Sequence, residues 1–282
     1  MAVKGISHPD RVERWAGVAV SAPALALVIA LFCIPFLNSF FISFRREAQW
    51  TLGNYATVGR LYLGDILFTA GVSLIALVAT LLVAVAIGGY LRLRPNRVVE
   101  FLFKIPLFIP FVVVGHAMRV FLAPHGLLNS ALAQVGLVNL AAPPSIAFSW
   151  LGIVVALTWK NMAMALLLVL GAFRGVREEY LESARNVGAA EWRLVKDVLL
   201  PMAAGSVAVA AVLIFSSMLA SFSIPLMIGS GKGAQMLMID IYYRIIYQQD
   251  YGVANALGVI SYLGATGAAI YYLRTVRSGE RS

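Results

Sequence analysis

Six long apolar stretches, separated by short polar segments, set the pattern of the 282-residue chain. A helix needs about 20 mostly apolar residues to cross the hydrocarbon core of a bilayer, and each stretch is long enough. The stretches cover residues 15–44, 66–91, 101–122, 146–173, 202–228 and 252–273. The pattern predicts an all-α, polytopic membrane protein with six transmembrane helices, folded as a single domain over residues 1–282.

The first stretch is longer than a span requires, and Pro35 lies inside it. Because proline lacks a backbone N–H and clashes with the preceding turn, we expect Pro35 to kink or end this helix. The basic start and the small residues Ala22 and Ala24 are typical of a signal peptide. The apolar run continues far beyond them, however, and a cleaved segment does not do this. We therefore expect a retained first helix.

Composition supports a membrane protein. The chain is 61% hydrophobic and only 12% charged, with a mean hydropathy of +0.85, whereas soluble domains carry about 25% charged residues. This excludes a disordered protein and argues against a soluble enzyme. The single cysteine, Cys33, excludes an internal disulfide and a cysteine-based zinc site.

The net charge of +9 is distributed as a topology signal. Fourteen Lys and Arg residues lie in the N-terminal segment, the 92–100 and 174–200 loops and the C-terminal segment, against five in the opposite loops. Since basic loops stay in the cytoplasm, both termini are predicted to be cytoplasmic. The charge then implies contact with membrane lipid and no nucleic-acid partner.

Two outward segments are too long for simple turns. Residues 123–145 contain no Lys or Arg, and their apolar positions predict a short amphipathic helix, lying on the outer membrane surface or against a neighbour. Residues 229–251 are polar in a similar way and carry Asp240 and Asp250.

The 28-residue cytoplasmic loop 174–201 also exceeds a plain connection between helices, which takes about 2–8 residues. We predict a helix over 178–187, a glycine C-cap at Gly188 and a second helix over 190–200. Pro201 is expected in the first turn of the next span, where its missing N–H costs little. The loop thus reads as a cytoplasmic helix-turn-helix.

A short amphipathic helix cannot bury its apolar face alone. The expected seam consists of Leu181, Ala184, Val187, Trp192, Val195, Val198 and Leu199. Two interpretations fit it equally: it folds against the inner membrane face of the protein itself, or it docks a cytoplasmic partner.

The residues of this loop resemble a known motif. Glu182-Ser183-Ala184, Gly188 and Val198-Leu199-Leu200-Pro201 resemble the EAA motif of membrane subunits of type I, binding-protein-dependent ABC importers. Ser183 replaces the first alanine and Val198 the isoleucine. Six spans, cytoplasmic termini and a motif between the fourth and fifth spans extend the resemblance over nearly the whole chain. Residues 122–136 also resemble the outward loop of the spermidine/putrescine permease group, and permeases for ferric iron, thiamine and phosphonates share related patterns.

The resemblance implies a permease subunit that works by alternating access in a bacterial inner membrane. Its partners would be cytoplasmic ATPase subunits, a second membrane subunit (preferably a paralogue) and a periplasmic solute-binding protein. ATP and Mg²⁺ would be bound by the ATPase, so this chain would hold no cofactor and would not itself be an enzyme. The coupling residues implied are Glu182, Ser183, Ala184, Gly188, Leu200 and Pro201.

Ionisable groups at membrane depth are candidates for function because their burial is costly. Lys104 and Arg119 lie near span ends, where snorkelling accounts for them. His116, Lys160 and Asn161 are the candidate pathway residues. No carboxylate within a span can pair with Lys160, so it faces the pathway, a partner subunit or a backbone carbonyl.

The substrate stays open at this level. The spans contain no Asp or Glu, which disfavours a polycation, yet the outward Asp240 and Asp250 with nearby tyrosines could attract one. Those tyrosines are Tyr242, Tyr243, Tyr247 and Tyr251. A small polar or charged solute, of polyamine type by resemblance, is the expectation, with ferric iron, phosphonate or another small organic ion as alternatives.

Other functions fit less well. The Gly-rich segment 229–233 lacks the spacing of a phosphate-binding loop, and the histidines are not spaced as a metal site, so we expect neither a metal site nor catalytic residues. A self-sufficient channel or secondary transporter would suit discontinuous helices broken by Pro106, Pro110 and Pro225, but leaves the 174–201 loop without a purpose. An intramembrane enzyme should show paired catalytic groups at membrane depth, and none are evident. A purely structural scaffold predicts no ATP-linked uptake, and the loop favours the importer.

Overall fold

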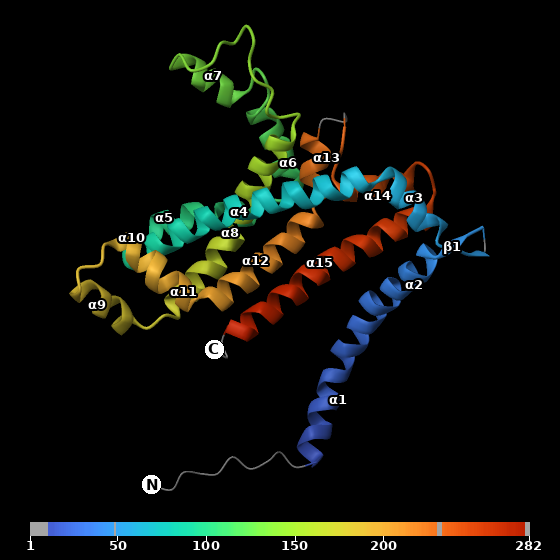
Figure 1. Cartoon of the computed structure of the whole chain (residues 1–282), viewed down its shortest axis with the longest axis horizontal. Coiled ribbons are helices and arrows are strands. Elements are labelled where there is room, and N and C mark those ends of the chain that lie inside the picture. Colours follow the sequence, from blue (N-terminus) through green and yellow to red (C-terminus); the bar gives the residue numbers. More distant parts are fainter. Residues whose placement is uncertain (1–10, 48, 230–232, 280–282) are drawn as a thin grey trace.

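The computed structural model describes residues 11–47, 49–229 and 233–279, and nearly all of its regular structure is helical (Figure 1). The only strands among these residues are β1 (Arg45–Arg46) and β2 (Gln49–Trp50), which pair antiparallel in a short hairpin. The predicted all-α class is confirmed.

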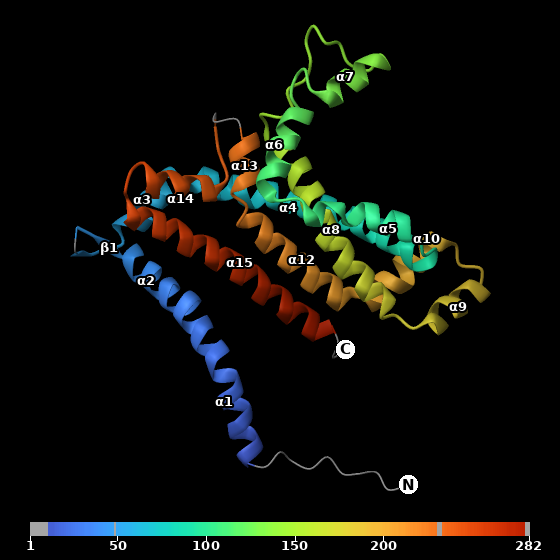
Figure 2. The ribbon, with the colours of Figure 1, turned by 180° about the vertical axis from the view of Figure 1, so that it is seen from behind.

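The N-terminal arm consists of α1 (Arg11–Val28), a π-helical turn η1 (Ile29–Cys33) and α2 (Ile34–Ser43). Pro35 does not end this helix, which continues to Ser43. The missing N–H instead falls directly after the wide π-turn, a usual way to absorb a proline within a helix. The arm stands away from the rest of the chain over most of its length (Figures 1 and 2).

The body is built around α8 (Trp150–Arg174), with α4 (Leu63–Leu93) packed along it. Small residues such as Ala76, Ala84 and Ala156 lie fully buried in this contact region and let the helices approach closely. α12 (Ala204–Leu219) and α15 (Tyr251–Gly279) complete the body, and α3 (Gly53–Leu61) and α14 (Leu237–Ile246) flank its far end.

Two predicted spans are broken rather than continuous. The third consists of α5 (Arg97–Lys104) with a 3₁₀ turn η2 (Ile105–Phe108), followed by α6 (Phe111–Phe121) after a bend of 105°. Pro110 explains the break, because proline directs the preceding residue, Ile109, into an extended conformation. α6 then leads into α7 (Leu127–Gln134), the short helix predicted for 123–145, and both project from the body (Figure 1).

The fifth span is also interrupted. α12 ends at Leu219, and a separate helix α13 (Ser223–Ile228) follows residues 220–222. Three helices of the described chain are long and apolar enough to cross a membrane as single elements, or up to five spans when each bent pair is counted as one. The sixth stretch forms the continuous helix α15, which is less apolar on average than α4 and α8.

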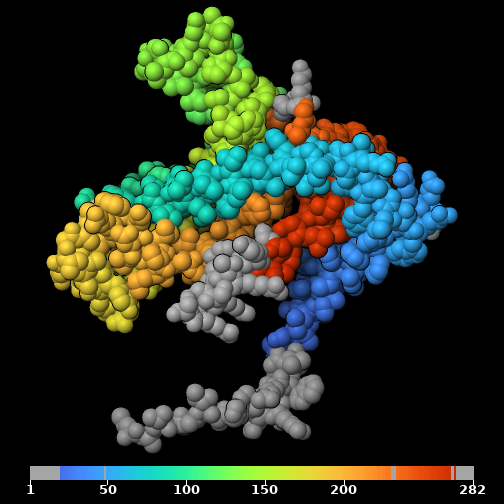
Figure 3. Space-filling view, viewed as in Figure 1, coloured from blue at the N-terminus to red at the C-terminus, as the bar shows by residue number. Residues whose placement is uncertain are grey.

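The predicted helix-turn-helix at 174–201 is present. Its elements are α9 (Glu178–Asn186), α10 (Glu191–Arg193), a π-helical stretch η3 (Leu194–Leu199) and α11 (Leu200–Met202). Pro201 lies inside α11 and not in the first turn of the next span, because the chain bends by 80° before α12 begins at Ala204. These elements form one end of the molecule (Figure 3).

Candidate coupling site

The first helix of the loop, α9, has one face on the body and one face exposed. Leu181 is fully buried and Ala184 half-buried, whereas Glu182 and Ser183 are exposed. Glu178 and Glu179 in the first turn and Arg185 in the last complement the helix dipole. Ser183 donates its hydroxyl to the Glu179 carbonyl at 2.8 Å, so it is satisfied within its own helix.

Gly188 ends α9 as predicted. Its φ of +84° lies in the left-handed region that glycine adopts without strain. The Gly188 N–H donates to the Arg185 carbonyl at 2.9 Å and the Ala189 N–H to the Ala184 carbonyl at 3.0 Å. This pair of bonds is a Schellman motif, which satisfies carbonyls left open at the helix end and fixes the turn between α9 and α10.

The second helix lies close against α4. Leu194 and Leu199 are buried, and a Cβ placed on Gly89 of α4 would come within 2.6 Å of the Val195 side chain. Glycine at position 89 therefore permits this close approach. Leu200 is half-buried and Pro201 exposed, and both lie beyond η3 in a different element from the α9 residues of the EAA-like motif.

The expected apolar seam of the loop divides between the body and the surface. Leu181, Leu194 and Leu199 pack into the main core cluster of the body. Val187 and Trp192, expected in the seam, are instead 84% and 59% exposed because they lie on the outer side of the turn. With Tyr180, also exposed, they define the outer apolar face of the loop.

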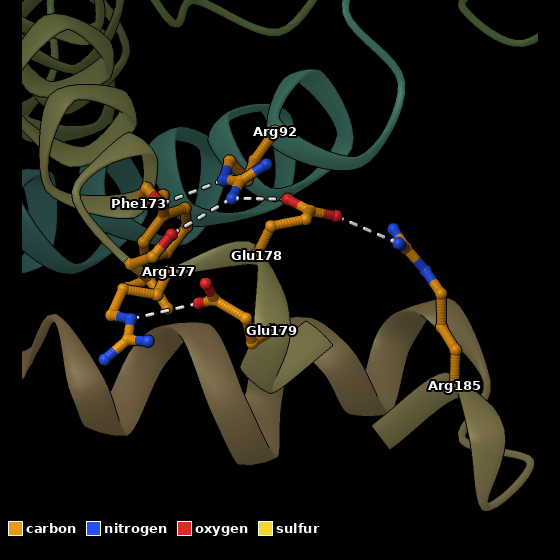
Figure 4. Close-up of polar contacts among 7 residues, drawn as sticks. Arg92, Phe173, Arg177, Glu178, Glu179 and Arg185 are labelled. Carbon is orange, nitrogen blue, oxygen red and sulfur yellow. Dashed lines mark hydrogen bonds and ion pairs between the residues drawn. The ribbon is translucent and has the colours of Figure 1, made fainter. Parts of the chain in front are cut away.

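An ionic network, which the sequence did not indicate, ties α9 to the body (Figure 4). Arg92 of α4 donates from Nε to the Phe173 carbonyl and from Nη2 to the Val176 carbonyl, both at 3.0 Å, and its Nη2 lies 2.7 Å from Glu178 Oε2. Glu178 also accepts from Arg185 at 3.0 Å. The hydrogen bond from Arg92 holds the pKa of Glu178 below its usual value; desolvation opposes this, and the hydrogen bond from Arg185 lowers the pKa further. Charge counting had assigned Arg92 only to membrane topology.

A second network supports the neighbouring helix. Glu100 on α5 binds Lys104 at 2.5 Å and Arg174 at 2.8 Å, which joins α5 to the end of α8. Arg94 pairs with Glu191 of α10 at 2.9 Å on the surface. Arg94 and Arg174, which were counted for topology, thus also hold the loop and α5 in place.

Lys160 reaches backbone carbonyls, one of the three settings expected for it. Its ammonium donates to the Pro106 carbonyl at 2.8 Å and the Ile109 carbonyl at 2.5 Å, and lies 4.6 Å from the Phe111 ring centre. It therefore stabilises the break between η2 and α6, where carbonyls lose their helical partners. Asn161 donates to Leu157 of its own helix.

The structure does not bring the three candidate pathway residues together. His116 lines an apolar groove of about 830 Å³ formed mainly by α6 and α8, while Lys160 and Asn161 make the contacts just described. Their role in transport stays a prediction.

The acidic residues of the segment that was predicted to face outward have partners. Asp240 is buried and accepts from the Gln235 side chain at 2.6 Å, and Asp250 pairs with Arg244 at 3.0 Å. Tyr242, Tyr243 and Tyr247 pack edge to face or tilted against one another, and Tyr242 also contacts Phe222. This arrangement leaves less free negative charge for a cation than the sequence suggested.

The broken apolar spans and the helix-turn-helix at one end define a polytopic membrane permease. Residues 76–277 match the family described as binding-protein-dependent transport system inner membrane component, and the chain belongs to that family. The predicted resemblance to permease subunits of ABC importers is confirmed.

Relatives and solved structures agree with this assignment. The chain is 24% identical to the trehalose/maltose transport system permease protein MalF of Thermococcus litoralis, over 94% of this chain and 95% of that protein. It is 20% identical to the spermidine/putrescine transport system permease protein PotB of Salmonella typhimurium, over 76% of each. A chain of a bacterial ABC transporter that imports the acidic polysaccharide alginate has the same fold, with a TM-score of 0.79 at 18% identity over 95% of this chain and 97% of that one.

Proposed function

We propose that this chain forms half of the translocation pathway of an ATP-driven importer and that α9 and the Gly188 turn dock on a separate ATPase subunit. The observation that carries the coupling role is the outer apolar face of the loop, where Tyr180, Val187 and Trp192 are exposed beside Glu182. Exposed apolar groups rimmed by charge are typical of a protein contact. The family membership supplies the kind of partner.

The rest of the assembly follows from the family and the charge pattern. We infer cytoplasmic termini, a periplasmic solute-binding protein and a second membrane subunit, preferably a paralogue, in a bacterial inner membrane. ATP and Mg²⁺ belong to the ATPase subunits. Binding of ATP must favour one conformation of the assembly over the other in order to drive alternating access.

The substrate we propose is a small polar or charged solute. The relatives and the structural neighbour are named for a neutral sugar, a polyamine and an acidic polysaccharide, so family membership does not select among charges. The engagement of Asp240 and Asp250 weakens the case for a polyamine. Ferric iron and phosphonate stay as alternatives.

The coupling role is tested with Gly188→Asp and Glu182→Lys, measured as ATP-dependent uptake in vesicles. Gly188→Asp places a side chain in the left-handed region and distorts the turn, and Glu182→Lys reverses the exposed charge. We expect both variants to insert in the membrane but to lose uptake and co-purification with the ATPase. Arg60→Glu, an exposed charge reversal on α3, is the matched control and should transport normally.

Two results would contradict the proposal. Normal uptake by both loop variants would remove the coupling role from this turn. Uptake by the purified chain alone, without any ATPase, would favour a self-sufficient channel or secondary transporter.

A further inference from the structure

Arg92 bridges the short link between two helices. α8 ends at Arg174 and α9 begins at Glu178, so only residues 175–177 connect them, starting with a glycine. The guanidinium of Arg92 contacts Phe173 before the link, Val176 inside it and Glu178 after it (Figure 4). One side chain of α4 thereby holds both sides of the junction.

The link has little other support on one side. A cleft of about 510 Å³ lies beside it, lined by residues of α8, the link, α9, α11 and α12, among them Gly175, Tyr180, Met202 and Ser206. Without the bonds from Arg92, the link has space to move, and α9 can shift relative to α8.

The chemistry suits arginine at this position. A guanidinium has five N–H donors in a rigid fork, so it can donate to two carbonyls and a carboxylate together, whereas a lysine is a single point charge. The Arg92 side chain is only 16% exposed and Phe173 and Val176 are buried, so the two carbonyl bonds are shielded from water. The Glu178 side chain, in contrast, is 45% exposed, so its ion pair is partly hydrated. Arg185, bound to the other oxygen of Glu178, orients the carboxylate toward Arg92.

We propose that Arg92 and Glu178 are a positioning pair that makes α9, the end of α8 and α4 move as one unit, so that displacement of α9 by the ATPase reaches the spans. This inference rests on the proposed function. The pair touches neither substrate nor nucleotide, and its effect is on how ATP hydrolysis is converted into transport.

The same loop contains a matched comparison. Arg177 and Glu179 form an ion pair at 3.0 Å, but their side chains are 69% and 67% exposed and the pair joins only neighbouring residues. Such a surface pair contributes little, because water screens it. Removing a charge from the Arg177–Glu179 pair therefore changes the charge of this segment but leaves the contacts of Arg92 intact, which makes it a suitable control.

The experiment reconstitutes the complete importer in proteoliposomes and measures substrate transported and ATP hydrolysed in the same preparation. For Arg92→Gln and Glu178→Gln, we expect normal assembly, hydrolysis within about twofold of the unmodified protein and transport reduced about tenfold, since coupling energies between sites span about 5- to 150-fold. Arg177→Gln and Glu179→Gln should leave the ratio of transport to hydrolysis unchanged. Arg92→Lys should fall between, because the contacts of Arg92 are made by two separate nitrogens, Nε and Nη2, and lysine has a single nitrogen in their place.

Each other outcome overturns the inference. An unchanged ratio in Arg92→Gln and Glu178→Gln would show that the pair does not transmit motion. Equal loss of transport and hydrolysis, or loss of the ATPase from the complex, would show a purely structural role. Glu178→Gln keeps the two carbonyl bonds of Arg92, so it still tests the inference if Arg92→Gln fails to fold. Absence of ATP-driven transport in the unmodified assembly would refute the proposed function itself.

Discussion

Asp240 on α14 is 5% exposed, and only one of its two carboxylate oxygens has a hydrogen-bond partner. Loss of water around the charged form raises its pKa to about 6, and the nearby Asp65 adds to this, while Gln235 and Arg244 act in the opposite direction. The sequence placed Asp240 in a polar outward loop and gave no sign that the loop folds over it.

The raised pKa predicts a pH-dependent stability. The folded chain holds the Asp240 proton more tightly than the unfolded chain, whose carboxyl has a pKa near 3.8. Stability from this group is therefore fully present below about pH 4 and is lost as pH rises through about 6. Asp240→Asn cannot ionise, so its melting temperature should fall less than that of the unmodified protein between pH 5 and pH 7.5.

Thermal unfolding of the purified protein in detergent at the two pH values measures this difference. Asp197→Asn, which removes an exposed carboxylate on η3, is the control and should keep the slope of the unmodified protein. An identical slope in Asp240→Asn would mean that another group sets the pH dependence.

At the scale of elements, the sequence predicted the presence of helices better than their continuity. Apolar length located the spans, and glycine chemistry located the end of α9 at Gly188. The prolines marked where breaks were allowed, but Pro35 lies inside a continuing helix whereas Pro110 follows a sharp bend. Pro110 holds Ile109 extended, and the bend is also supported by a contact distant in sequence, that of Lys160 with the Ile109 carbonyl, which no local pattern contains.

The same limit applies to the coupling site. The motif residues of α9 could be named from their spacing, whereas the contact of Arg92 with Phe173 and Val176 spans more than 80 positions of the chain. The outward exposure of Val187 and Trp192 likewise depends on how the two short helices turn against α4.

The contacts of Lys160 lead to a prediction about what stabilises the bend in the third span. Lys160→Met leaves the Ile109 carbonyl without its donor, while the Pro106 carbonyl keeps only the Ile109 N–H at 3.4 Å. An unsatisfied buried polar group costs about 1–3 kcal/mol. We expect a lower melting temperature and a wider range of α6 orientations. Spin labels at Val120 on α6 and Leu167 on α8, in a Cys33→Ser background, would report the latter as a broadened distance distribution.

Asn161→Ala is the matched control on the neighbouring position. Asn161 bonds only within its own helix, so its removal should leave the α6 distance distribution unchanged. If Lys160→Met gives the same narrow distribution as the unmodified protein, packing rather than this ammonium fixes the bend.

At the scale of the whole molecule, the N-terminal arm is the part that the chain itself does not cover. In the most apolar 18-residue segment within residues 20–43, no residue is buried by the rest of the chain. In the most apolar 18-residue segment of α8, 61% of the residues are buried. The arm touches α15 through Phe36 on Tyr262 and Ser39 on Asn255. Lipid tails are as apolar as leucine, so lipid or a second membrane subunit satisfies the exposed face equally well on hydrophobicity alone.

Close packing distinguishes a protein neighbour of the arm from lipid. If the proposed second subunit covers the arm, we expect close packing around it in the complete importer. Helices associate in membranes through close van der Waals packing against each other. Cys33, exposed in the π-turn of the arm, is the single cysteine of the chain and accepts a nitroxide label without further substitution. Molecular oxygen concentrates in the bilayer interior, so collision of oxygen with the nitroxide should be frequent in the chain alone and reduced severalfold in the complete importer. Equal collision rates in the two preparations would mean that lipid covers the arm in both, and that the second subunit contacts the body instead.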